Sequence, residues 1–118
     1  VEVFDGRGGN DTIDGAGGID QVRYDGGNVS GSLVVNLGTN SATYNAIEAD
    51  ALFNIENVRG SNNADSITGN AGANFLEGMG GNDTLVGGDG NDTMTGGLGD
   101  DSLTGGTGSD VFRFASSN

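Results

Sequence analysis

Large apolar side chains recur singly along much of this chain, nine residues apart, with glycine and polar residues between them. A nine-residue frame gives six consecutive units over residues 60–113, of which GMGGNDTLV from Gly78 and GGDGNDTMT from Gly87 are the clearest. The sixth position is Asp in five of these units and Asn in one, and the eighth is apolar. Two similar units start at Gly6 and Gly15. Such a fixed period is typical of a repeat architecture.

Each unit combines a turn with a short strand. Positions one to six are rich in glycine, which permits positive φ and close approach of backbone groups. Positions seven to nine place one apolar residue between polar or β-branched neighbours, as expected of a three-residue strand with one side inward. Two units would form one coil of 18 residues, and stacked coils would pair their strands in parallel. The sequence therefore predicts an all-β parallel solenoid with two buried columns: Ile67, Leu85 and Leu103 in one, Leu76, Met94 and Phe112 in the other.

The glycine pattern lapses over residues 24–59, an interval that equals four units and so keeps the frame. Its end places Glu56 and Val58 at positions six and eight, and SLVVNLGTNSATY predicts a strand, a turn and a second strand. We interpret this interval as a longer-looped part of the same solenoid; a separate small β-module is the alternative. The predicted organisation is one domain, 1–118, with first repeats at 1–23, a degenerate segment at 24–59 and six repeats at 60–113.

The charge of the chain changes this picture. The sequence has 17 acidic residues against 4 Arg and no Lys, a net charge of −13, and 25 Gly. Low hydrophobicity with high net charge indicates either disorder or a bound cation that supplies what the core lacks, and the ordered repeats favour the cation. An acidic surface is repelled by nucleic acid and anionic lipid. No apolar run is long enough to span a membrane.

The residue types restrict which cation fits. The chain has no His and no Cys, which excludes zinc sites built on these residues, Cys or His catalysis, and disulfides. Oxygen ligands suit Ca²⁺ or Mg²⁺, and Ca²⁺ better accepts an irregular cage of turn carbonyls and carboxylates. In a stacked coil, turn 78–83 would lie over 96–101 and turn 87–92 over 105–110, with an ion between each pair. We expect at least four ions over residues 60–110 and one or two over 6–25.

Three units, GGDGNDTMT, GMGGNDTLV and GGLGDDSLT, are near-perfect matches to the pattern GGxGxDxUx, where U is a large apolar residue. The chain thus resembles the RTX repeats of hemolysin-type calcium-binding proteins over about two-thirds of its length. Residues 32–61 also resemble the segment that often precedes an RTX array. The resemblance implies a right-handed parallel β-roll with Ca²⁺ between turns, bound by the Asp side chain and turn carbonyls, and export by type I secretion.

The metal ligands expected from this resemblance lie in the glycine-rich turns. They are Gly6, Gly8, Asp11, Gly15, Gly17, Asp20, Asp65, Asn74, Gly78, Gly80, Asp83, Gly87, Asp89, Asp92, Gly96, Leu98, Asp101, Gly105, Thr107 and Asp110. Turns 60–65 and 69–74 depart from the pattern, so we expect weaker or shared sites there. Glu56 is longer than Asp and is expected to have a different role. Acidic residues off the sixth position, such as Asp14 and Asp50, are expected to be solvated turn residues.

The expected function is that of a calcium-binding module that is expanded without calcium. It would fold on binding extracellular Ca²⁺ and support the folding, secretion and stability of neighbouring domains in a larger secreted or cell-surface protein. One alternative is an adhesin or polysaccharide-binding module, for which Arg7, Arg23, Arg59 and Arg113 are few and scattered. A second alternative is a repeat module of a secreted enzyme whose catalytic domain lies elsewhere. No active site is expected within the chain, because carboxylates committed to calcium are poor acids and bases.

Overall fold

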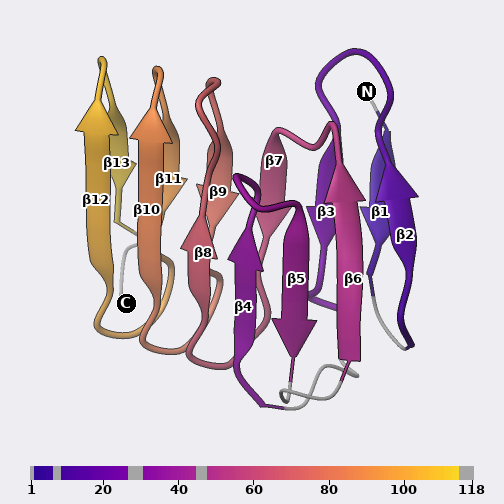
Figure 1. The fold of residues 1–118 in the computed structure, drawn as a ribbon. Coiled ribbons are helices and arrows are strands. Elements are labelled where there is room, and N and C mark those ends of the chain that lie inside the picture. Colours follow the sequence, from indigo (N-terminus) through magenta and orange to yellow (C-terminus); the bar gives the residue numbers. More distant parts are fainter. Residues whose placement is uncertain (1, 7–8, 27–30, 45–47, 115–118) are drawn as a thin grey trace.

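The computed structural model describes residues 2–6, 9–26, 31–44 and 48–114, and every regular element in them is a β-strand. The strands form two sheets that face each other across one core (Figure 1). In chain order they are β1 (Val3–Asp5), β2 (Thr12–Asp14), β3 (Gln21–Arg23), β4 (Leu33–Asn36), β5 (Ser41–Tyr44), β6 (Glu48–Phe53), β7 (Asn57–Arg59), β8 (Ser66–Thr68), β9 (Phe75–Glu77), β10 (Thr84–Asp89), β11 (Thr93–Thr95), β12 (Ser102–Thr107) and β13 (Val111–Arg113).

The six-stranded sheet is parallel throughout and has the order β1-β3-β7-β9-β11-β13. Its inward column pairs Leu76 with Met94 and Met94 with Phe112, as predicted. The column continues through Val58 and Val22 on β7 and β3. The frame of the repeats is therefore kept across the interruption on this side of the molecule.

The seven-stranded sheet has the order β12-β10-β8-β4-β5-β6-β2. The predicted column is present, since Leu85 pairs with both Ile67 and Leu103. The predicted strand–turn–strand is also confirmed: β4 and β5 form an antiparallel hairpin, and β6 pairs antiparallel with β5. Because β4 pairs in parallel with β8 and β6 with β2, these three strands lie inside the sheet rather than beside it.

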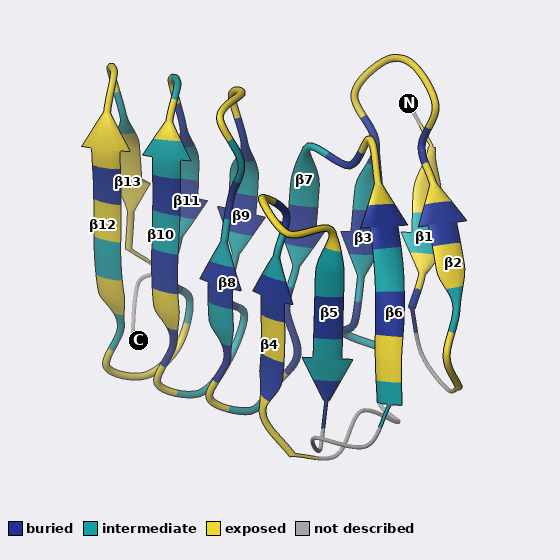
Figure 2. Ribbon diagram, viewed as in Figure 1, coloured by how far each residue is buried: buried dark blue, intermediate teal, exposed yellow. Residues whose placement is uncertain are grey.

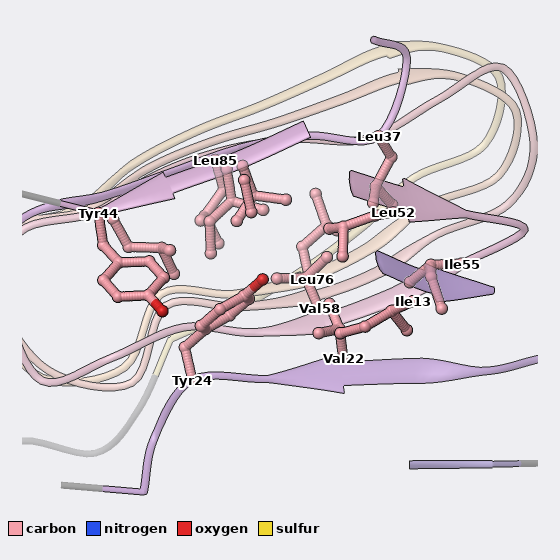
Figure 3. Packing of buried hydrophobic residues seen from close by; sticks show 14 of the residues in the cluster. Ile13, Val22, Tyr24, Leu37, Tyr44, Leu52, Ile55, Val58, Leu76 and Leu85 are labelled. Atoms are coloured by element: carbon pink, nitrogen blue, oxygen red, sulfur yellow. The ribbon is translucent and has the colours of Figure 1, made fainter. Parts of the chain in front are cut away.

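Most of the buried hydrophobic residues lie between Ile13 and Val58, on the inserted strands and those next to them (Figures 2 and 3). The rings of Tyr24 and Tyr44 lie 6.0 Å apart at one end of the buried cluster. The hydroxyl of Tyr24 donates to Asp50 Oδ2 at 2.9 Å, and Asp50 is only 3% exposed. The expectation that Asp50 is a solvated turn residue is wrong, because this tyrosine and the amide of Asp11 bind its carboxylate inside the molecule.

The core thins toward β12 and β13. Phe112, predicted as a core residue, is 45% exposed, and Leu103 is only partly buried. Both strands lie at the outer edge of their sheets, so among the described residues no further strand packs over them. Each of the two inward columns is thus fully buried as far as Met94 or Leu85 and becomes more exposed at the next strand.

Candidate metal centre

The side chains at position six join each turn to the one 18 residues earlier. Asp101 Oδ1 accepts the backbone amide of Asp83 at 2.9 Å, and Asp110 Oδ1 accepts that of Asp92 at 3.0 Å. The same bond links the amide of Asp65 to Asp83 at 2.8 Å. One oxygen of each carboxylate is therefore part of the backbone hydrogen-bond network and holds consecutive turns in register.

Neighbouring turns also contact each other directly. Over turn 78–83, the amide of Leu98 donates to the Met79 carbonyl at 2.8 Å, and Gly80 and Leu98 form an isolated parallel bridge. In the next pair, the Thr107 hydroxyl donates to Asp89 Oδ1 at 2.7 Å. The structure thus brings turn 78–83 against 96–101, and turn 87–92 against 105–110, as the period predicted.

The second carboxylate oxygen is different. In Asp20, Asp83 and Asp92, Oδ2 is buried and has no hydrogen-bond donor among the described residues, and all three residues are 1% exposed. Burying an ionised oxygen without a donor or a cation is costly. Burial raises the pKa of Asp83 to about 6, and the carboxylates of Asp65 and Asp101 add to the rise. Burial also raises the pKa of Asp92.

The first glycine of each turn allows these oxygens to face a carbonyl. A Cβ on Gly78 would collide with Asp83 Oδ2 and would lie 2.6 Å from the carbonyl oxygen of Gly96. A Cβ on Gly87 would collide with Asp92 Oδ2 and would lie 2.7 Å from that of Gly105. Each pair of stacked turns therefore brings a carboxylate oxygen close to a carbonyl oxygen, with no side chain between the two atoms. A hard cation that accepts oxygen ligands fits this donor set.

Two classes of turn can be separated by the residue at position two. In the turns that we call open, this residue has a positive φ: Ala16, Met79, Gly88, Gly97 and Gly106. In the turns that we call closed, its amide donates to the side chain at position six: Ser61 to Asp65 Oδ2 at 2.7 Å, and Asn70 to Asn74 Oδ1 at 2.9 Å. In the described part of the chain, the three buried carboxylate oxygens without a donor all belong to open turns.

Protein donors satisfy the closed turns further. The Ser61 hydroxyl donates to Asp65 Oδ1 at 2.8 Å, and the Asn74 amide group donates to the Glu56 carbonyl at 2.8 Å. Burial still raises the pKa of Asp65, but these hydrogen bonds oppose the rise. Turns 60–65 and 69–74, which depart from the repeat pattern, are thus the turns in which protein groups form hydrogen bonds with the position-six side chain.

The first turn is arranged around tyrosines. The hydroxyl of Tyr44 donates to the carbonyl oxygens of Gly6 and Gly9, both at 3.2 Å. The Tyr24 ring lies so close to Gly6 that any Cβ there would collide with it. Of the other predicted ligands in this turn, Gly8 lies outside the described residues, and Asp11 contacts Asp50 through its amide.

Several residues of these sites were not predicted. Tyr24, Tyr44 and Asp50 lie in the interval 24–59, where the repeat pattern lapses, so no local signal identified them. Ser61 could have been recognised, because a hydroxyl at position two can bond the carboxylate four residues later. In the described part of the chain, no three acidic side chains converge on one point, so backbone carbonyls must complete any cation site.

Comparison with known families agrees with this geometry. The family model of the RTX calcium-binding nonapeptide repeat matches residues 2–28, 59–94 and 77–112, with four copies of the repeat. The chain belongs to the RTX repeat family. The RTX family is a non-catalytic, calcium-binding module, so the cofactor of this chain is Ca²⁺, and its repeats fit several ions. The segment between the matches contains the inserted strands β4, β5 and β6.

A comparison with curated proteins found no match. The described residues contain no helix long and apolar enough to cross a membrane.

Proposed function

We propose that this RTX module couples its folding to extracellular calcium and that, once folded, it stabilises neighbouring domains of a larger secreted protein. In this proposal the repeats form a right-handed β-roll of 18-residue coils with ions between stacked turns. The ions lie between turns 78–83 and 96–101 and between 87–92 and 105–110. Without calcium, the chain is expanded.

One observation carries the proposal: the buried Oδ2 atoms of Asp83 and Asp92 each face a carbonyl oxygen and lack a donor among the described residues. Folding without a cation must bury these oxygens against each other, which opposes the folded state. A bound Ca²⁺ attracts both oxygens, so bringing them together then favours the folded state. Because the oxygens converge only when the turns stack, the free energy of calcium binding becomes free energy of folding.

The ligands follow from the open turns. We propose that Asp83, Asp92, Asp101 and Asp110 bind calcium through side chains, and that positions one and three contribute carbonyls. The carbonyl set comprises Gly78, Gly80, Gly87, Asp89, Gly96, Leu98, Gly105 and Thr107. At Asp89 and Leu98 the backbone oxygen is the candidate ligand, since the Asp89 carboxylate accepts the Thr107 hydroxyl and the Leu98 side chain is 60% exposed. Asp65 and Asn74 use protein donors in place of an ion.

Calcium-coupled folding would allow the chain to fold only after it has been secreted. Extracellular modules commonly bind Ca²⁺ with dissociation constants of about 10⁻⁴–10⁻³ M. Such sites would stay empty in the cytosol and fill outside the cell. The chain would therefore remain expanded for export by type I secretion and fold after it.

The described arginines do not favour the adhesin or polysaccharide alternative. Arg59 contacts Glu77 at 3.2 Å and Asp25 at 3.6 Å, and Arg23 contacts Asp25 at 2.7 Å. Arg113 lies over the Phe75 ring, 5.9 Å from its centroid. These side chains balance the acidic surface within the molecule, so we do not propose a second function.

Far-UV circular dichroism during a calcium titration tests the proposal, with magnesium as the control ion. We expect a cooperative gain of β signal with calcium alone, at submillimolar to millimolar concentration. A full β signal in excess chelator would contradict it, because the buried oxygens would then need no ion to fold.

A further inference from the structure

Turn 15–20 lies against a neighbour that is not an RTX repeat. Strand β2 leads into this turn and pairs in parallel with β6, so the Gly15 amide donates to the Phe53 carbonyl at 2.9 Å. In the regular array, the Gly78 amide donates in the same way to Thr95, also at 2.9 Å. Asn54 therefore occupies the place that the first glycine of a following repeat would take, although the family match does not extend to it.

Two oxygens converge beside Gly15. Asp20 is 1% exposed, and its Oδ2 has no donor among the described residues. A Cβ on Gly15 would lie 2.8 Å from Asp20 Oδ2 and would collide with the carbonyl oxygen of Asn54. This is the same arrangement that Asp83 Oδ2 makes with the Gly96 carbonyl beside Gly78.

Glu56 has the same contact here that Asp101 has in the regular array. Its Oε2 accepts the amide of Asp20 at 2.9 Å, just as Asp101 Oδ1 accepts that of Asp83. Only Ile55 separates Glu56 from Asn54, whereas four residues separate Gly96 from Asp101. The extra methylene of glutamate allows a shorter turn to bring a carboxylate to the equivalent position.

Asn54 is itself held in place. Asp14 Oδ1 accepts both the Asn54 side-chain amide at 2.7 Å and the Ala16 backbone amide at 2.8 Å. Asn54 has a positive φ of 54°, a conformation that asparagine tolerates better than most residues. These contacts fix the carbonyl of Asn54 beside Gly15. Asp14 is exposed, as expected, and accepts these two hydrogen bonds at the surface.

We propose that the Asp20 carboxylate, the Asn54 carbonyl and the Glu56 carboxylate form a calcium site between the first repeats and the interruption. The inference rests on the proposed calcium-coupled folding and adds a site in which one side is not an RTX turn. An ion here would join the end of β2 and the start of β3 to the short turn between β6 and β7. All its ligands are oxygens, the chemistry that Ca²⁺ accepts.

The test counts bound calcium ions by native mass spectrometry of the whole chain at saturating calcium. Glu56→Gln removes the charge but keeps an oxygen that can accept the Asp20 amide, and Asp20→Asn does the same on the other side. Glu48→Gln, at the far end of β6, is the matched control. Asp92→Asn, in the regular array, is the positive control.

We expect Glu56→Gln and Asp20→Asn each to lose one ion, and their double variant to lose the same single ion. Glu48→Gln keeps the full count, and Asp92→Asn combined with Glu56→Gln loses two. A full count in both Glu56→Gln and Asp20→Asn, with an unchanged calcium titration, would overturn the site. So would loss of every ion together with the β signal. If the unmodified chain binds no calcium, the proposed function itself fails, which is a distinct outcome.

Discussion

Replacing Asp83 by Asn should change the stability of the chain in opposite directions with and without calcium. The carboxylate of Asp83 is buried, and one oxygen faces the Gly96 carbonyl with no donor from the residues that the structure describes. An asparagine keeps an oxygen for the Asp65 amide and places an NH₂ group toward that carbonyl. Asn74 shows that an asparagine fits at position six, although its NH₂ group donates to the Glu56 carbonyl of the preceding turn at 2.8 Å.

The magnitudes follow from the pKa and from binding linkage. The pKa of Asp83 is raised from 3.8 to about 6, so ionising it in the calcium-free fold costs roughly 1–2 kcal/mol after allowance for solvent screening. Asp83→Asn removes that cost in chelator. In calcium at about ten times the dissociation constant, the variant loses one site worth about 1.4 kcal/mol, which lowers Tm by roughly 4–8 °C in a domain of this size.

The assay is urea denaturation followed by circular dichroism, in chelator with sucrose to populate the folded state and again in saturating calcium. Asp100→Asn is the control, because it removes the same charge from an exposed position in a neighbouring turn. We expect a higher urea midpoint for Asp83→Asn in chelator and a lower one in calcium. Equal destabilisation in both conditions would refute the reasoning, since the carboxylate would then act only through packing.

Three further predictions test other parts of the site, and a fourth tests the order in which the molecule folds. Because folding raises the pKa of Asp83, the calcium-free folded state binds a proton at Asp83 more tightly than the unfolded chain does. The stability of the calcium-free fold should therefore rise as pH falls from about 6 to 4, which circular dichroism at several pH values can measure. The calcium affinity should fall over the same range, which calorimetric titration can measure. Gly87→Ala should lower stability by about 2–4 kcal/mol in calcium, because the new Cβ collides with Asp92 Oδ2; a Tm equal to that of the unmodified chain would show that the turn can adjust. Ser61→Ala removes a hydroxyl donor from the buried Asp65 and should lower the free energy of unfolding by about 1–3 kcal/mol, as measured by urea denaturation. This loss should be at least as large in chelator as in calcium. Hydrogen exchange should show protection of β4 and β7–β9 at lower calcium than β10–β13, because the former group adjoins most of the buried hydrophobic residues and contains the closed turns; simultaneous protection would indicate a single cooperative unit.

The regular part of the fold could be predicted because the signal is local and repeated. A strand of three residues with one apolar side chain recurs every nine positions, so the pairing of Leu85 with Ile67 and Leu103 follows from counting. The stacking of turn 78–83 on 96–101 follows from the same count. The oxygen chemistry of the turns favoured calcium over magnesium, and the family resemblance agreed with that choice.

The interruption could be predicted only in part. The alternation around Val35 indicated the β4–β5 hairpin, but nothing local indicated that β6 would pair with β2 across 39 residues. The burial of Asp50 depends on Tyr24, 26 residues away, so its sequence neighbourhood gave no sign of it. The exposure of Phe112 depends on its place at the edge of a sheet, which the repeat pattern does not encode.

The position-six side chain has two tasks, and only one of them requires calcium. Its first oxygen accepts an amide from the preceding turn, a task that Asp101 and the longer Glu56 both perform. Its second oxygen needs a positive partner, and the residue at position two decides which kind. Where Ser61 turns its amide and hydroxyl toward Asp65, the protein supplies that partner. Where Met79 has a positive φ, no described residue donates to Asp83 Oδ2. We therefore infer that calcium dependence along this RTX chain is set by the backbone at position two as much as by the aspartate at position six.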